Sequence, residues 1–164
     1  MKKKNITKGS KNIYLIGGAV LFVLLLVLTI FTSPQKVNSE VITNEGIIIE
    51  KDKITKTATF IPFESNGTYM EIIAIEANDG SIRTALNTCQ VCYNSGRGYY
   101  EQLGDVLICN NCGNQFTIDQ IELVKGGCNP VPILTEMKTE NDKTITIDVN
   151  SLVEFEYLFA NWRR

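Results

Sequence analysis

The pattern of apolar and polar positions divides the chain into a basic tail, an uninterrupted apolar run and a long alternating body. Residues 13–32 are 20 residues without a charge, about the length that crosses a hydrocarbon core of roughly 30 Å. Five lysines precede this run and only Lys36 follows it closely, so the positive-inside rule places the N-terminus in the cytoplasm. We expect a cytoplasmic basic tail at 1–12, a single transmembrane helix at 13–32 and a polar linker at 33–45. A cleaved signal peptide is the alternative, although no A-x-A-like site follows the run.

Residues 46–164 predict a mainly β domain outside the membrane, because short runs rich in Ile, Val, Thr and Phe alternate with turn residues. Asn78-Asp79-Gly80 separates two such runs and predicts a hairpin that leads directly to Cys89. Pro62 lacks an amide hydrogen, so we expect it at a sheet edge or at the end of its strand. The expected strands are residues 46–50, 54–63, 68–77, 81–86, 115–123 and 144–149, with a short hairpin formed by 99–100 and 106–108.

The end of the chain predicts one helix. Ser151 and Glu154 have the spacing of a capping box, and apolar residues then recur at helical spacing. These residues are Leu152, Phe155, Leu158, Phe159 and Trp162. We expect this amphipathic helix to pack on the sheet.

Charge and composition exclude several functions. Six of the 16 Lys and Arg residues precede residue 37, whereas all 18 Asp and Glu residues follow it, so the body is acidic and nucleic acid is not an expected partner. The chain contains no histidine, which excludes covalent c-type haem attachment, His-ligated zinc and any imidazole-dependent triad. No general acid-base pair or nucleophile arrangement stands out, so we do not expect an enzyme.

All five cysteines lie in one stretch and have the spacing of a metal site. Cys89 and Cys92 form one C-x2-C pair, sixteen residues follow, Cys109 and Cys112 form a second pair, and Cys128 comes last. Two such pairs on separate loops supply the four sulfurs of a tetrahedral zinc or a small iron-sulfur cluster. Two disulfides and a spare thiol are the alternative. Thiolate spacing alone leaves zinc, iron-sulfur and copper open.

Cys128 has three possible roles. It is an alternative or additional ligand, a disulfide partner of one C-x2-C cysteine when metal is absent, or an inert thiol in a glycine loop. Gly126 and Gly127 permit the close backbone approach that a site requires. We expect the aromatic residues between and beside the pairs to shield the site: Tyr93, Tyr99, Tyr100 and Phe116.

Two family resemblances follow from these residues. The segment around Cys109 and Cys112, continuing to Pro132, resembles the second cluster-binding loop of Rieske proteins, although both Rieske histidines are replaced by cysteine. The chain resembles the FtrD-like family of membrane iron-sulfur proteins more closely. Asp79 to Tyr93, Gly98 to Tyr100, Ile108 to Phe116 and Gly126 to Pro130 carry that resemblance.

The FtrD-like resemblance implies that all five cysteines belong to the family pattern and that the protein works in bacterial iron uptake. It implies partners in trans: an iron-uptake permease, a cupredoxin-like protein and a polyferredoxin-type membrane protein. Some members have a larger multi-span membrane region, whereas this chain is expected to have one anchor. The resemblance implies a Rieske-like small β domain that binds an iron-sulfur cluster at Cys89, Cys92, Cys109 and Cys112, with Cys128 as a further metal ligand.

The expected function is electron transfer or metal handling in iron uptake by a membrane-anchored, extracytoplasmic domain. A zinc-stapled structural or interaction module is the alternative from another class. A direct iron or copper carrier is the third, in which the thiolates deliver the ion instead of electrons.

Overall fold

The computed structural model describes residues 40–43 and 46–164, and side chains from residue 46 onward. The expected basic tail, transmembrane helix and most of the linker lie outside these residues. No helix in the described part is long and apolar enough to span a membrane. The described residues form one compact unit.

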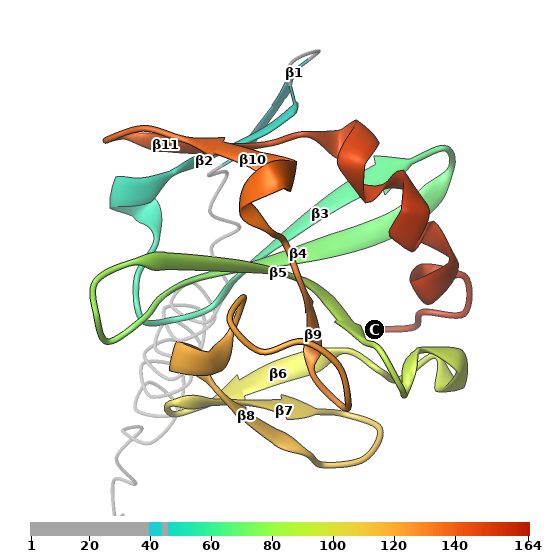
Figure 1. Cartoon of the computed structure of the whole chain (residues 1–164). Coiled ribbons are helices and arrows are strands. Elements are labelled where there is room, and N and C mark those ends of the chain that lie inside the picture. Colours follow the sequence, from blue (N-terminus) through green and yellow to red (C-terminus); the bar gives the residue numbers. More distant parts are fainter. Residues whose placement is uncertain (1–39, 44–45) are drawn as a thin grey trace, which may run out of the picture. The chain divides into compact units, whose positions relative to one another are not determined.

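The described residues form eleven strands in three antiparallel sheets, joined by short 3-10 helices (Figure 1). The expectation of a mainly β fold with one longer helix is thereby confirmed. The first sheet has the order β1-β2-β11-β10, the second β3-β4-β5-β9 and the third β6-β7-β8. The strands are β1 Glu40–Thr43, β2 Gly46–Glu50, β3 Thr59–Ser65, β4 Thr68–Glu76, β5 Ile82–Cys89, β6 Tyr100–Leu103, β7 Val106–Cys109, β8 Gln115–Thr117, β9 Pro130–Pro132, β10 Lys138–Glu140 and β11 Thr144–Ile147. The 3-10 helices are η1 Lys51–Lys53, η2 Tyr93–Ser95, η3 Ile118–Gln120, η4 Thr135–Met137 and η5 Val149–Phe159.

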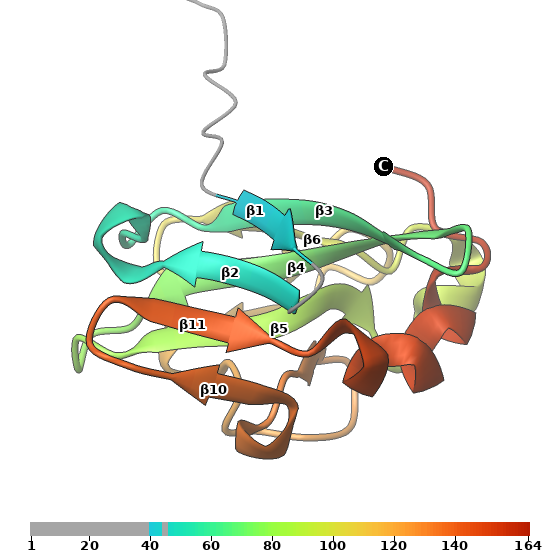
Figure 2. The same cartoon turned by 90° about the horizontal axis from the view of Figure 1, so that it is seen from above.

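Strand β4 lies in the middle layer and is buried on both faces. Ile72 and Ala74 belong to a core shared with β2 and β11, whereas Ile73 and Ile75 belong to a second core shared with β6, β7 and β8. Successive side chains of a strand point to opposite faces, so a continuous apolar run is what a strand between two layers requires. Figure 2 shows the β1-β2-β11-β10 sheet lying over the β3-β4-β5 strands. The second core contains Cys89, Cys92 and Cys109.

Turn residues predicted the hairpins well. The strands β4 and β5 pair in antiparallel register around the Asn78-Asp79-Gly80 turn, where Gly80 has φ +81°. The pairing of β6 with β7 confirms the short hairpin before Cys109. Pro62 lies in β3, which is an edge strand as expected.

Several strand expectations need correction. The expected strand 115–123 ends at Thr117, because a capping box between Thr117 and Gln120 starts helix η3. The strand expected from residue 54 begins only at Thr59. Strands β9 and β10 were not expected, and β1, which pairs with β2, lies in the segment expected to be a linker.

The C-terminal helix η5 is a 3-10 helix and begins earlier than expected. The side chain of Asp148 accepts a hydrogen bond from the Asn150 amide (2.9 Å) and caps the helix. The prediction that Ser151 and Glu154 form a capping box was therefore wrong. Val149, Leu152, Phe155 and Leu158 are three residues apart, which aligns them along one side of a helix with three residues per turn. Leu152 and Leu158 are buried in the core shared with β3 and β4, so the helix packs on the sheet as predicted.

Candidate metal centre

The first cysteine loop begins where β5 ends. The amide of Cys89 donates to the Gly98 carbonyl (2.7 Å), and the amide of Cys92 donates to the Cys89 sulfur (3.3 Å). A Cβ atom at Gly98 would lie 2.8 Å from the Cys92 carbonyl carbon, so a side chain there would displace the loop. The absence of a side chain at Gly98 therefore lets the chain fold back against the first C-x2-C pair.

The second loop begins where β7 ends. The Cys109 amide donates to the Asn114 carbonyl (2.9 Å), and the Gly113 amide donates to the Cys109 carbonyl (2.8 Å). Gly113 has φ +72°, a conformation that favours glycine. Register places Cys109 opposite Tyr100 of β6, so the loop starts from a paired strand.

A third loop, between η3 and β9, brings Cys128 to the same place. Its carbonyl accepts hydrogen bonds from the Tyr100 hydroxyl (2.8 Å) and the Asn114 side-chain amide (3.0 Å). Two residues later Pro130 pairs with Cys89. The third loop is thereby tied to residues of both C-x2-C loops.

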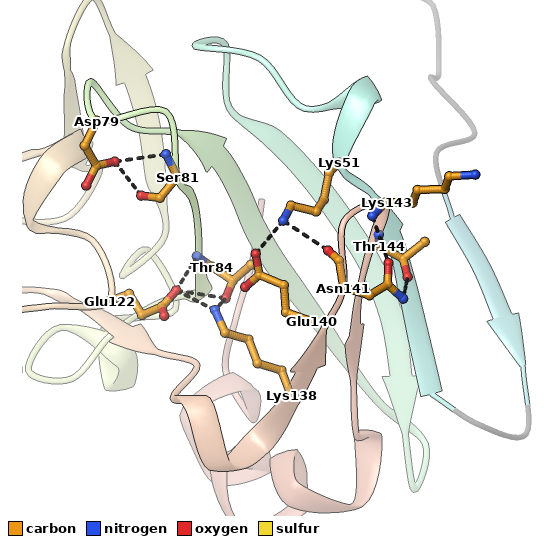
Figure 3. A network of polar contacts seen from close by, with 10 residues as sticks. All are labelled: Lys51, Asp79, Ser81, Thr84, Glu122, Lys138, Glu140, Asn141, Lys143 and Thr144. Carbon is orange, nitrogen blue, oxygen red and sulfur yellow. Dashed lines mark hydrogen bonds and ion pairs between the residues drawn. The ribbon is translucent and has the colours of Figure 1, made fainter.

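The start of the third loop is held by a buried ion pair between Glu122 and Lys138. Glu122 accepts hydrogen bonds from the Thr84 amide (3.0 Å) and from Lys138 Nζ (2.7 Å), and Lys138 also donates to the Thr84 hydroxyl (3.0 Å). Figure 3 shows these side chains converging from three separate segments. The Lys138 and Glu122 side chains are only 6% and 15% exposed. Glu122 has φ +69°, a strained conformation for a residue with a side chain, and these contacts hold it there.

The sulfur atoms of all five free cysteines converge, with Cys128 in contact with three others. The Cys128 sulfur lies 3.2 Å from that of Cys89, 3.5 Å from Cys92 and 2.9 Å from Cys112. Four sulfurs, those of Cys89, Cys92, Cys109 and Cys128, lie within 4.8 Å of one another. Cys112 is not in this inner set and is exposed to solvent.

The inner set suits a thiolate-binding metal. Four sulfurs at about 2.3 Å from one tetrahedral ion would lie about 3.8 Å apart, close to the separations in the set. A cluster of several irons binds its cysteines through different irons, so those sulfurs would need to move farther apart than this. The donor chemistry fits zinc, iron and cuprous ion, and the compactness is closest to a single ion.

The contacts among the thiols separate their pKa values. The hydrogen bond from Cys128, followed by that from the Asn114 amide, lowers the pKa of Cys112 to about 7. Burial first, and then the hydrogen bond to Cys112, raises the pKa of Cys128. Burial raises the pKa of Cys109 to about 12. In the metal-free protein, therefore, Cys112 ionises more readily than Cys128.

Two neighbouring polar groups, Tyr100 and the Cys92 amide, lower the pKa of Cys89. Burial acts to raise the pKa of Cys89, but hydrogen bonds from Tyr100 and from the Cys92 amide outweigh it and lower the pKa. Burial and the hydrogen bond to Cys89 raise the pKa of Tyr100, whose side chain is fully buried. Tyr100 therefore stays neutral beside the thiols, and its hydroxyl hydrogen is donated to the Cys128 carbonyl.

The low pKa of Cys112 predicts its reactivity in the metal-free protein. Iodoacetamide attacks the thiolate, so labelling of Cys112 should rise between about pH 6 and 8 with a midpoint near pH 7. Cys128→Ala removes the principal donor and should move the midpoint toward the ordinary value of about 8.5. Mass spectrometry of the labelled protein measures both curves. Equal midpoints in the two proteins would show that Cys128 does not stabilise the Cys112 thiolate.

The sequence spacing and the structure agree that the five cysteines form one site. They differ on which cysteines lie at its centre. All five predicted cysteines converge, but Cys112 lies at the solvent edge and Cys128 at the centre. Tyr100 and Phe116 pack in the same core as the cysteines, as expected of shielding residues. Tyr93 instead packs against Tyr157 and Tyr99 against Trp162. The sequence analysis did not identify Glu122 or Lys138 as supports of the site.

Comparison with known proteins identifies a family. The family model for "Membrane iron-sulfur containing protein FtrD-like" matches residues 54–159, which include all five cysteines. No curated protein and no solved structure matches the chain.

Proposed function

Because the chain belongs to the FtrD-like family of membrane iron-sulfur proteins, we propose that its inner cysteines bind iron and that the domain transfers electrons. The observation that carries this proposal is the convergence of four thiol sulfurs within 4.8 Å in a domain without histidine. Cys89, Cys92, Cys109 and Cys128 would hold the iron. Cys112, which the sequence analysis placed among the ligands, would lie beside them at the surface.

Thiolate-bound iron supplies an exchangeable electron, and the protein sets its potential. If the iron forms a two-iron cluster with only cysteine ligands, its potential should lie near about -400 mV. The Cys92 amide donates to the Cys89 sulfur (3.3 Å), which stabilises the added charge of the reduced state. Val91, between the first two cysteines, is 62% exposed, so the first loop comes to the surface, where a partner protein could approach.

The cellular role is part of the same proposal. The domain would lie outside the membrane on the anchor predicted at residues 13–32 and pass electrons, or iron, to an iron-uptake system. Its partners in trans would be a permease and associated cupredoxin-like or membrane proteins. The acidic body favours a basic docking surface on such a partner. The two cysteine loops on a small β domain support a Rieske-like arrangement in which Cys92 replaces one histidine and Cys128, in place of Cys112, supplies the fourth sulfur.

A zinc-stapled module is the second candidate, and the compactness of the inner set favours it. The sulfur separations are close to those around one tetrahedral ion. In that case the ion would stabilise the three loops and the domain would serve as an interaction module. A copper or iron carrier would use the same thiolates to deliver the ion.

Metal and sulfide analysis of the full-length protein tests the proposal. The protein is purified anaerobically in detergent, and its visible spectrum is recorded before and after dithionite. Iron in the protein with visible absorption that bleaches on reduction supports electron transfer, and acid-labile sulfide then distinguishes a cluster from a single iron. One zinc per chain and a colourless protein would contradict the proposal and leave the structural module. Asn111→Ser, an exposed change within the second loop, serves as the control for purification.

A further inference from the structure

Two thiols meet at the solvent edge of the site. The sulfurs of Cys112 and Cys128 are 2.9 Å apart, the shortest of the three contacts that Cys128 makes. A disulfide bond is about 2.05 Å long, so the two sulfurs must approach by less than about 1 Å to bond. Cys112 is exposed, whereas Cys89, Cys92 and Cys109 are buried. An external reagent therefore reaches Cys112 first.

The chain around both thiols has room for that approach. Gly126 and Gly127 precede Cys128 and Gly113 follows Cys112, and at each of these glycines an added Cβ would meet no atom within 4 Å. Cys89, the other near neighbour of Cys128, is fully buried at the end of β5, and its amide is bonded to Gly98. The short separation of the sulfurs and the access to Cys112 both favour Cys112 as the partner.

We propose that Cys112 and Cys128 form a thiol–disulfide exchange pair. The Cys112 thiolate attacks a disulfide of an external partner, RSSR, forming a Cys112–SR bond and releasing RS⁻. The Cys128 thiol then loses its proton, attacks the Cys112 sulfur and releases the second RS⁻. Two thiols of the chain are oxidised to one disulfide, and the partner's disulfide is reduced to two thiols. A dithiol reductant reverses both steps.

If this disulfide forms, it must be reduced before the site can bind metal. The disulfide uses Cys128, which leaves only three thiols in the inner set. A thiol–disulfide exchange that reduces this bond must then precede metal binding, and oxidation during metal release would trap the empty site. This consequence rests on the metal-binding function proposed above, whereas the disulfide itself does not.

Peptide mapping tests the pairing directly. Trypsin separates the cysteines into peptides 84–97, with Cys89 and Cys92, 98–125, with Cys109 and Cys112, and 126–138, with Cys128. The full-length protein is stripped of metal with a chelator, oxidised with glutathione disulfide and digested without reduction. We expect 98–125 linked to 126–138, with fragment spectra assigning Cys112. A link from 84–97 to 126–138, or bonds within the first two peptides, would overturn the proposal.

A kinetic measurement on the metal-loaded protein provides a second test that does not depend on folding without metal. Glutathione disulfide is added with a chromophoric chelator, and metal release is followed by absorbance. Cys112→Ser should slow this oxidant-dependent release at least tenfold, and dithiothreitol should restore metal binding to the oxidised wild type. Asn111→Ser is the matched control and should release metal at the wild-type rate. Equal rates for Cys112→Ser and wild type would overturn the proposal whichever metal is bound.

Discussion

Cys128→Ser is expected to weaken metal binding about a hundredfold or more. Zinc binds structural sites with an apparent free energy of about 10–16 kcal/mol, which is about 3 kcal/mol for each of four ligands. A loss of about 1.4 kcal/mol weakens binding tenfold. Cys128 contacts the sulfurs of Cys89 and Cys92, both in the inner set, so its loss removes a central ligand. Competition with a chromophoric chelator measures the change, and metal analysis after gel filtration gives the stoichiometry.

Cys112→Ser is the matched comparison for that variant. The residue belongs to a C-x2-C pair but lies outside the inner set and is exposed. Its replacement should leave one equivalent of the metal centre per chain and change the affinity by less than tenfold. The reverse order, with Cys112→Ser losing metal and Cys128→Ser retaining it, would return the ligand set to the two C-x2-C pairs.

Lys138→Met is expected to lower the free energy of unfolding by about 3 kcal/mol. The substitution leaves the Glu122 carboxylate largely buried without its cation, and breaking a buried pair in this way costs about 3–5 kcal/mol. The Thr84 amide would still donate to Glu122 and offset part of the loss, which favours the lower end of that range. Urea unfolding of the metal-loaded protein measures the change. Because Glu122 begins the loop that carries Cys128, metal affinity should fall as well.

Lys51→Met provides the control for Lys138→Met. Lys51 pairs with Glu140 at 2.6 Å, but the two side chains are 26% and 45% exposed, so the pair is solvated. Loss of such a pair should change the free energy of unfolding by no more than about 1 kcal/mol. Similar losses for Lys51→Met and Lys138→Met would show that burial of the Glu122 pair contributes little.

Local signals in the sequence predicted most of the strands and hairpins. Asn78-Asp79-Gly80 specified the β4-β5 turn, and the apolar run of β4 is continuous because both of its faces are covered. The C-terminal helix was expected with α-helical spacing, although the three-residue period from Val149 to Leu158 already favoured a 3-10 helix. This three-residue spacing can be recognised from the sequence alone.

The central position of Cys128 was not predictable from spacing. It depends on the pairing of β9 with β5, which places Pro130 opposite Cys89 across about forty residues of chain. The Glu122–Lys138 pair and the Asn114 contact are also long-range, and no local pattern marks them. C-x2-C spacing correctly located two loops but could not indicate that Cys112 faces solvent.

X-ray absorption spectroscopy of the metal-loaded Cys112→Ser protein tests the central claim most directly, because it counts the sulfur neighbours of the metal. We predict the same number of sulfur neighbours as in the wild type, since Cys89, Cys92, Cys109 and Cys128 remain. Cys128→Ser should lose one sulfur neighbour or lose the metal. A sulfur neighbour replaced by oxygen in Cys112→Ser, with an unchanged count in Cys128→Ser, would contradict the assignment of the inner four cysteines.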